Sequence, residues 1–407
     1  MRFFKRKNRK EIVVLVPGFG AFNREDNPLF HYWGGHMDLS SWLLREGLPL
    51  ISGDCGPVSS NWDRACELYA FLAGGRTDYG RAHSERFGHR RYGTEFPGVL
   101  PDLGTRNGPL LHLLGHSMGG QTARMLIHLL EEGSREERDA TPSEDLSPLF
   151  RGGRRCVRSC MTLATPHNGT SLTTIIQNRM GLVRTFLAFL AEFQGTGLLP
   201  FRFKMDHWEI LRRQEGESLR AYRNRMFSLS FWENEKDQAL YDLSPEGAFR
   251  MNLEIPASPG VYYFSVSMSA TYRDPLLKTE IPRLGIHPAL AANALYLSRQ
   301  SAPHSVLNSG PVSWKVSDGM VNTLSMKAPV WGSRDRVTEL TGLPGQPAGA
   351  LRKGVWHSWP VLENFDHWKQ QGWSAVSPVY GLPGPVKGLS LPEWYRDLMQ
   401  FLLDLPY

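Results

Sequence analysis

Apolar residues form two kinds of pattern along this chain. Short continuous runs between turn residues indicate strands that are buried on both faces of a parallel sheet. We predict strands at four such runs, which span residues 12–16, 110–114, 157–163 and 262–268. Apolar residues at helical spacing predict amphipathic helices over 120–132 and 391–402. Because strands and helices alternate, the pattern predicts an α/β fold with a mainly parallel central sheet flanked by helices.

The segments between these elements predict how the domain is organised. The Gly- and Pro-rich stretches at 342–349 and 382–385 do not separate regions of different composition, so we predict a single domain over residues 1–407. Residues 171–245 form a stretch that is longer than a simple crossover and rich in Phe, Leu and Arg. We interpret this stretch as a cap inserted into the sheet domain.

The positive charge of the chain is concentrated at one end. The net charge is +6, and the first ten residues alone carry six cations. The remaining chain is therefore formally neutral, which argues against the basic groove or helix that nucleic-acid binding requires. We expect the basic end to be a frayed terminus, with contact to an anionic membrane surface as the alternative.

Membrane insertion and export leave recognisable signals in a sequence. A membrane-spanning helix needs roughly 20 apolar residues, whereas the most apolar stretch, 182–201, contains Arg184, Glu192 and several glycines. The run at 12–16 is too short for the apolar part of a signal peptide. We therefore predict no transmembrane segment and no signal peptide, which would place the protein in the cytoplasm. The four cysteines lack CxxC spacing, so they do not require an oxidising compartment.

A candidate nucleophile lies between a predicted strand and a predicted helix. Residues 115–119, Gly-His-Ser-Met-Gly, match the G-x-S-x-G pattern in that context. A sharp strand-to-helix turn holds a serine hydroxyl clear of the backbone, and the flanking glycines avoid collisions with neighbouring strands. We therefore predict that Ser117 is a nucleophile; the alternative is a serine in an ordinary turn.

A serine nucleophile needs a base, and the base needs an acid that orients it. With the chain order Ser, acid, His, His367 is favoured because a loop after the last strands could return it over Ser117, and His357 is the nearest competitor. Asp318 precedes a glycine at a predicted strand end, whereas Asp366 adjoins the histidine and would point elsewhere. We predict Asp318 as the acid and His367 as the base.

Two backbone amides are candidates for an oxyanion hole. The N–H of Met118 follows the candidate nucleophile, and the N–H of Phe19 lies in the Gly18-Phe19-Gly20 turn after the first predicted strand. Each such donor is worth roughly 10²–10³ in rate, by analogy with measured deletions. The alternative for residues 17–20 is an ordinary glycine turn.

Longer motifs make the chain similar to one family and cover nearly its whole length. They are Tyr-Trp-Gly-Gly at 32–35, Pro-Val-Ser-Ser-Asn-Trp-Asp-Arg-Ala-Cys-Glu at 57–67, Asp-Tyr-Gly at 78–80, Gly-Gly-Gln-Thr-Ala-Arg-Met-Leu at 119–126, Ala-Thr-Pro-His-Asn-Gly-Thr at 164–170 and Tyr-Asp-Leu-Ser at 241–244. With these motifs the chain resembles the bacterial triacylglycerol lipases of the thermoalkaliphilic Bacillus group and of staphylococci. The resemblance implies an α/β-hydrolase fold with an inserted zinc-binding segment and a helical lid. It also implies hydrolysis of lipid esters through an acyl-enzyme, with Ser117, Asp318 and His367 as nucleophile, acid and base.

The resemblance further implies a structural zinc ion. The family holds it with two Asp and two His, and the motifs transfer these ligands to Asp63, His83, His89 and Asp242. Zinc accepts carboxylate oxygen and imidazole nitrogen in closed four-ligand sites, so the residue types suit it. We expect the ion to pin the inserted segment 55–95 to the core rather than to take part in hydrolysis.

Two departures from the family pattern change what the resemblance implies. The family has a calcium site with acidic side chains where this chain has Lys369 and Ser374. Calcium needs several oxygen ligands and negative charge, so we predict that the site is lost and that the Lys369 ammonium replaces the charge of the ion. Pro17 stands where the family usually has a His, which changes the geometry of the oxyanion loop.

The family's lid and substrate class define the remaining expectations. The lid would lie at about 172–200 and meet lipid at an oil–water interface; the alternative is a fixed helix in an ordinary core.

The family is exported, which conflicts with the missing signal peptide. An esterase or acyltransferase acting on short-chain soluble esters would use the same serine chemistry. A catalytically silent lipid- or partner-binding protein is disfavoured because all three triad positions are filled.

Overall fold

The centre of the molecule is a seven-stranded parallel sheet with the strand order β11-β12-β7-β6-β5-β1-β2. The structure is a computed structural model that describes residues 9–22, 30–177, 204–210, 214, 216–228, 231, 234–308, 312–346, 349–373 and 390–407. The strands of the sheet are β1 (Glu11–Val16), β2 (Leu50–Ser52), β5 (Leu110–His116), β6 (Val157–Leu163), β7 (Tyr262–Val266), β11 (Arg336–Glu339) and β12 (Val355–Ser358).

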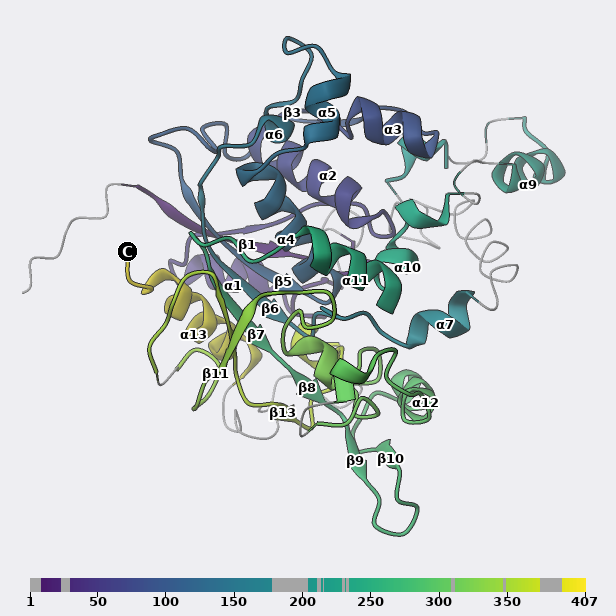
Figure 1. Cartoon of the computed structure of the whole chain (residues 1–407), viewed down its shortest axis with the longest axis vertical. Coiled ribbons are helices and arrows are strands. Elements are labelled where there is room, and N and C mark those ends of the chain that lie inside the picture. Colours follow the sequence, from purple (N-terminus) through teal and green to yellow (C-terminus); the bar gives the residue numbers. More distant parts are fainter. Residues whose placement is uncertain are drawn as a thin grey trace, which may run out of the picture.

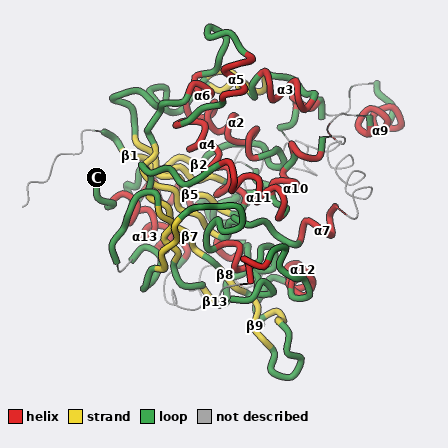
Figure 2. The backbone as a smooth tube through the Cα atoms, in the orientation of Figure 1, coloured by secondary structure: helices red, strands yellow, loops and turns green. Residues whose placement is uncertain are grey.

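Helices cover both faces of this sheet, as Figures 1 and 2 show. Alternate residues of β1 enter different cores: Val13 packs with α1 (Leu39–Arg45) and α13 (Leu391–Leu403), whereas Val14 packs with α2 (Asn61–Ala73) and α4 (Met118–Glu131). Every residue of β1, β5 and β6 is buried, because both faces of the sheet are covered. The predicted α/β-hydrolase fold with a mainly parallel sheet is therefore confirmed.

Smaller elements lie around the sheet. The remaining helices are α3 (Arg81–Phe87), α5 (Arg135–Ala140), α6 (Pro148–Arg151), α7 (Leu172–Gln177), α9 (Leu219–Phe227), α10 (Ala239–Asp242), α11 (Pro245–Glu254) and α12 (Pro288–Leu297). The short 3₁₀ helices are η1 (Asp206–Trp208), η3 (Glu235–Asp237), η4 (Ser305–Asn308), η5 (Thr323–Met326) and η6 (Lys369–Gln371). Three two-stranded sheets pair β3 (Gly75–Asp78) with β4 (Tyr92–Phe96), β8 (Met268–Ser269) with β13 (Leu362–Glu363), and β9 (Thr271–Arg273) with β10 (Glu280–Pro282).

Two element boundaries differ from the pattern for physical reasons. The helix expected from residue 120 begins at Met118, because the turn at Ser117 ends β5 and starts α4 directly. The strand expected over 262–268 divides after Val266, and Met268 pairs with Leu362 of β13 instead of continuing in the large sheet. This second divergence carries the chain out of the sheet toward β9.

The two predicted insertions are described to different extents. Segment 55–95 contains α2, β3, α3 and β4, whose elements lie in the upper part of Figure 1. Segment 171–245 contains α7, α9 and α10, but its residues 178–203, which hold most of the predicted lid, lie outside the described residues. The boundaries of both insertions stay predictions. No helix among the described residues is both long enough and apolar enough to cross a membrane.

Candidate active site and metal centre

The candidate nucleophile occupies a strained turn at the carboxyl end of β5. Ser117 has φ 55° and ψ −130°, a conformation that L-residues rarely adopt. A Cβ at Gly115 would come within 2.5 Å of the Gly120 nitrogen, and one at Gly119 within 2.1 Å of the Val16 oxygen. Both positions therefore require glycine, and the G-x-S-x-G pattern reflects backbone packing around the serine.

The three residues predicted as nucleophile, base and acid lie in one hydrogen-bonded chain. Nε2 of His367 lies 3.0 Å from Oγ of Ser117, and Nδ1 of the same ring lies 2.6 Å from Oδ2 of Asp318. The other carboxylate oxygen, Oδ1, accepts the backbone N–H groups of Met320 and Val321 at 2.9 and 2.8 Å. All three side chains are buried. The carboxylate is thus held from one side and orients the imidazole on the other.

The two competing residues serve other contacts. His357 lies within β12, where its Nδ1 is 3.1 Å from the backbone oxygen of Tyr263. The carboxylate of Asp366 accepts the backbone N–H groups of His287 and Trp368, both at 3.0 Å. Asp366 therefore points away from the serine, as predicted, and fixes the loop that carries the neighbouring histidine.

The turn after β1 packs directly against the nucleophile. A Cβ at Gly18 would come within 2.8 Å of Cβ of Ser117, so only glycine allows this approach. Among the described residues, neither the Phe19 nor the Met118 backbone N–H donates a hydrogen bond. Two free amides beside a buried serine hydroxyl are the feature that an oxyanion hole needs.

Two buried side chains hold the turn at residues 17–20, the candidate oxyanion turn. The N–H of Gly18 donates to the hydroxyl of Tyr32 at 2.7 Å, and the same hydroxyl lies 2.7 Å from Nδ1 of His116. Burial lowers the pKa of His116 well below its usual range, which keeps this ring neutral and able to accept. On the other side, the Arg64 guanidinium donates to the backbone oxygen of Pro17. The loop geometry that Pro17 introduces is therefore fixed by hydrogen bonds.

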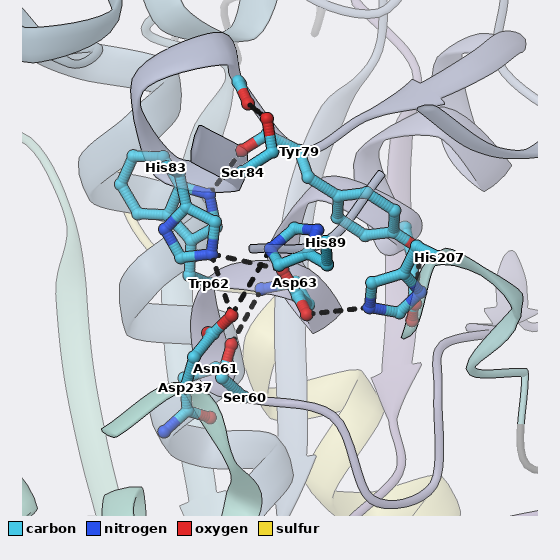
Figure 3. Close-up of polar contacts among 12 residues, drawn as sticks. Ser60, Asn61, Trp62, Asp63, Tyr79, His83, Ser84, His89, His207 and Asp237 are labelled. Atoms are coloured by element: carbon cyan, nitrogen blue, oxygen red, sulfur yellow. Dashed lines mark hydrogen bonds and ion pairs between the residues drawn. The ribbon is translucent and has the colours of Figure 1, made fainter. Parts of the chain in front are cut away.

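A second polar cluster brings together two carboxylates and two imidazoles. Nε2 of His83 lies 3.1 Å from Oδ2 of Asp237 and 3.4 Å from Oδ1 of Asp63, and Nε2 of His89 lies 3.3 Å from the Asp237 oxygen. The four candidate ligand atoms all lie within 4.8 Å of one another. Figure 3 shows the four side chains pointing toward one another, with His207 on the far side of Asp63.

Helix ends and a buried carboxylate position this cluster. Asp63 lies in the first turn of α2, and His83 lies in the first turn of α3. The buried carboxylate of Glu137 accepts the backbone N–H of His83 at 2.7 Å, which fixes the start of α3. His89 follows the end of α3, and Asp237 ends η3. Three regions of the chain, α2, α3 with the residues that follow it, and η3, therefore converge on one point.

The chemistry of the cluster fits a bound divalent metal. Oδ1 of Asp63 and Nε2 of His89 are buried without a hydrogen-bond partner among the described residues. Nδ1 of His89 faces the backbone oxygen of Arg90 at 2.9 Å, so it carries the hydrogen and leaves Nε2 with a free lone pair. Burial alone would lower the pKa of His83, but the carboxylates of Asp237 and Asp63 raise it to about 10. The cluster therefore favours positive charge at its centre.

The prediction of Asp242 as the fourth ligand is wrong. Oδ2 of Asp242 accepts the backbone N–H of Asn61 at 2.5 Å, at the start of α2, and burial raises the pKa of this carboxyl to about 7. Its place in the cluster is taken by Asp237. The two acids are five residues apart in one stretch, and only the turn of η3 followed by α10 decides which one reaches the histidines.

The sequence patterns also missed His207. Its Nε2 lies 2.9 Å from Oδ2 of Asp63, and its ring stacks on Tyr79 with the centroids 4.1 Å apart. His207 is 144 positions from Asp63 in the chain, so no spacing rule connects the two. It orients the carboxylate that faces the candidate metal.

Comparisons with known proteins match both the fold and the sequence. The family model described as lipase-like, C-terminal domain, matches residues 8–377. The chain belongs to this lipase-like family. It is 32% identical to the lipase of Staphylococcus hyicus over 97% of this chain and 58% of that protein. It is likewise 32% identical to lipase 1 of a Staphylococcus aureus strain over 87% of this chain and 50% of that protein. The chain thus spans between half and three fifths of the length of these relatives.

Three solved structures are similar to this chain over nearly its whole length. The S. hyicus lipase crystal structure has a TM-score of 0.82 at 32% identity and covers 98% of this chain and 96% of that chain. EstA from Clostridium botulinum has a TM-score of 0.80 at 36% identity, with 98% and 88% covered. Lipase 1 from Pelosinus fermentans has a TM-score of 0.77 at 37% identity, with 98% and 100% covered. These matches confirm the resemblance to staphylococcal lipases.

The residues that depart from the family's calcium pattern are only partly described. The ammonium of Lys369 donates to the backbone oxygen of Asn364 at 2.9 Å and lies 3.9 Å from Oδ2 of Asp366. A cation therefore lies beside the loop that carries His367, which is consistent with the Lys369 hypothesis. Ser374 lies outside the described residues, so the predicted loss of the calcium site stays a prediction.

Proposed function

We propose that this protein is a triacylglycerol lipase, a serine carboxylic-ester hydrolase that works through an acyl-enzyme. The observation that carries the proposal is the hydrogen-bonded chain from Asp318 through His367 to Ser117, whose two links measure 2.6 and 3.0 Å. The names of the lipases that the chain resembles support the choice of lipid esters as substrates. Ser117, His367 and Asp318 act as nucleophile, base and acid.

The reaction follows from the position of the imidazole between the two other groups. Oγ of Ser117 bonds to the ester carbonyl carbon while Nε2 of His367 takes the hydroxyl proton. His367 then gives that proton to the leaving alcohol oxygen as the carbon–oxygen bond breaks, which leaves an acyl group on the serine. A water molecule next attacks this acyl group, and its proton passes to His367 and then to Ser117 as the fatty acid departs. Asp318 holds the tautomer and stabilises the imidazolium in both halves.

The backbone amides of Phe19 and Met118 stabilise the negative oxygen of each tetrahedral intermediate. This role is supported by their position beside Ser117 and by the absence of other acceptors for their N–H groups among the described residues. Tyr32 and Arg64 hold the turn that carries the first amide. Such preorganised donors need no rearrangement as charge develops, which is why they accelerate the reaction.

The cluster of Asp63, His83, His89 and Asp237 holds a structural zinc ion in our proposal. Two carboxylates and two imidazoles are a donor set that suits a closed four-ligand zinc site, so no ligand position would remain for a substrate. A bound ion would cross-link α2, the α3 region and η3 through these side chains. The role proposed for the ion is to stabilise the fold, because the ester hydrolysis described above needs no metal.

The substrate class distinguishes two candidate functions that share this chemistry. A lipase prefers long-chain esters at an oil–water interface, whereas an esterase or acyltransferase acts on short-chain soluble esters. The test is hydrolysis of an ester series from short to long acyl chains, as monomers and as emulsions, by the wild type and by Ser117→Ala. Preference for long emulsified esters supports the lipase, and activity on short soluble esters alone supports the alternative. Equal rates for both proteins would contradict the assigned nucleophile.

A further inference from the structure

A hairpin formed by β9 and β10 projects from the body of the molecule and carries exposed leucines. Figure 1 shows it extending beyond β8, β13 and α12, at the bottom of the view. Leu276 and Leu277 at its tip are 89% and 67% exposed, and Leu284 after β10 is fully exposed. Large apolar side chains gathered on one projection mark an interaction site more often than scattered ones do. Among the described residues, these three leucines are the most exposed of the large hydrophobic side chains.

The tip of the hairpin is a preformed turn. Oδ1 of Asp274 accepts the backbone N–H groups of Leu276 and Leu277 at 2.9 and 2.7 Å, and the backbone of Asp274 bonds to Thr279 and Lys278 across the turn. The Asp274 carboxylate is thus engaged with amides, and the two leucine side chains are left facing outward. Because the turn is already ordered, inserting its leucines into a binding partner requires little further loss of chain entropy.

Exposed cations flank the leucines. Lys278 follows them directly, and Arg273 precedes them at the end of β9. Glu280, which pairs with Arg273 across the hairpin, is buried, and burial raises the pKa of its carboxyl. Apolar side chains beside exposed basic groups match a lipid–water interface, where leucines enter the acyl region and cations remain among the headgroups.

The base of the hairpin connects to both loops of the proposed triad. The N–H of Ala270 donates to the backbone oxygen of Ser317, which precedes the acid, at 2.8 Å. Arg283 donates to Glu363 of β13 at 2.7 Å, and the His287 N–H donates to Asp366 beside the base. An external surface bound by the hairpin tip would therefore lie close to the segments that carry Asp318 and His367.

From these observations we infer that the β9–β10 hairpin docks the enzyme on the surface of its lipid substrate. A convex tip with a few leucines offers too little area for a stable protein interface, which needs about 800 Å² per partner. A lipid surface has no such requirement, because it deforms around the inserted side chains. The inference rests on the proposed function, since it names the lipid surface as the docking partner of that same site.

The test measures vesicle binding separately from chemistry. Leu276→Asp/Leu277→Asp is compared with Leu253→Asp, a change at a leucine on α11 that is 58% exposed. All binding measurements use the Ser117→Ala background, so that hydrolysis does not alter the vesicles. Co-sedimentation with vesicles of phosphatidylcholine and phosphatidylglycerol is expected to weaken at least about tenfold for the double variant and to stay unchanged for the control.

Catalysis is then measured with Ser117 restored. Hydrolysis of a soluble short-chain ester is expected to match the wild type in both variants, whereas hydrolysis of an emulsified long-chain ester falls only in the double variant. Wild-type vesicle binding by the double variant would overturn the inference. Hairpin-dependent binding without any ester hydrolysis by the wild type would uphold the docking surface and reject the proposed function.

Discussion

The hydroxyl of Tyr32 lies 2.7 Å from Nδ1 of His116, the residue that precedes the proposed nucleophile. The same hydroxyl accepts the N–H of Gly18 from the turn that carries the Phe19 amide. One buried side chain therefore sets the distance between the serine turn and the oxyanion turn. Neither residue has a chemical step in the proposed mechanism, yet both contact segments that carry groups proposed to act in it.

Replacing Tyr32 by Phe tests this positioning role. The change leaves the buried Gly18 N–H without an acceptor, so we expect a loss of about 1–3 kcal/mol in the free energy of unfolding. Displacement of the oxyanion turn should also lower kcat for a soluble ester, by roughly tenfold to a hundredfold. Urea unfolding and steady-state kinetics measure the two effects. Tyr92→Phe, at an exposed ring on β4, is the control, and equal behaviour of both variants would contradict the role.

Asp318 and Asp366 form a matched pair for testing the acid. Asp318→Asn removes the carboxylate that orients His367, and we expect kcat to fall by about 10⁴. Asp366→Asn keeps an oxygen that can accept backbone N–H groups, so it should retain most of the activity. Kinetics on a soluble ester compare the two. A larger loss for the Asp366 variant would reverse the assignment.

The corrected metal site predicts a clear difference between two neighbouring acids. Asp237→Asn should lower the zinc content and the Tm, because it removes one of four ligands and leaves two buried histidines facing each other. Asp242→Asn should keep equimolar zinc, since an amide oxygen can still accept the Asn61 N–H. Elemental analysis and thermal unfolding with and without a chelator measure this. Zinc lost from the Asp242 variant and kept by the Asp237 variant would restore the original ligand set.

Buried neutral histidines predict how stability changes with pH. Burial lowers the pKa of His167 far below its usual range. On acidification, this ring therefore binds a proton in the unfolded chain but not in the folded protein. The stability that this group contributes is present above about pH 6.5 and is lost as the pH falls below that value. Between pH 7.5 and 5.5 this one group should cost about 1.4 kcal/mol.

Urea unfolding of His167→Gln at the two pH values isolates that contribution. The variant should lose about 1.4 kcal/mol less than the wild type between pH 7.5 and 5.5, because glutamine does not titrate. His36→Gln, at an exposed ring, serves as the control. An unchanged pH dependence in the His167 variant would show that this ring binds a proton equally in the folded and unfolded states, which would contradict the lowered pKa.

The strands and the hydrogen-bonded chain of Ser117, His367 and Asp318 could be predicted because local patterns indicate them. The run 157–163 is apolar enough to be buried on both faces, and β6 has those bounds. Gly115, Ser117 and Gly119 are required by contacts within a few residues, so the motif identifies the turn. The order of the chain then left few choices for Asp318 and His367.

The missed residues depend on how distant segments turn in space. Asp237 and Asp242 lie in one acidic stretch, and the short turn of η3 rather than the composition selects the first. His207 reaches Asp63 from η1, and no residue pattern near it indicates that contact. The exposed leucines at 276 and 277 likewise become a surface feature only because β8 leaves the large sheet and starts a projecting hairpin.

Covalent trapping of the nucleophile tests the proposed chemistry most directly. An alkyl phosphonate ester reacts with a serine that is activated by a neighbouring imidazole, and mass spectrometry of digested protein locates the adduct. We expect one adduct, on Ser117, that is absent from Ser117→Ala and forms far more slowly in Asp318→Asn. An adduct on another residue, or equal labelling of the wild type and Ser117→Ala, would contradict the assignment of Ser117, His367 and Asp318.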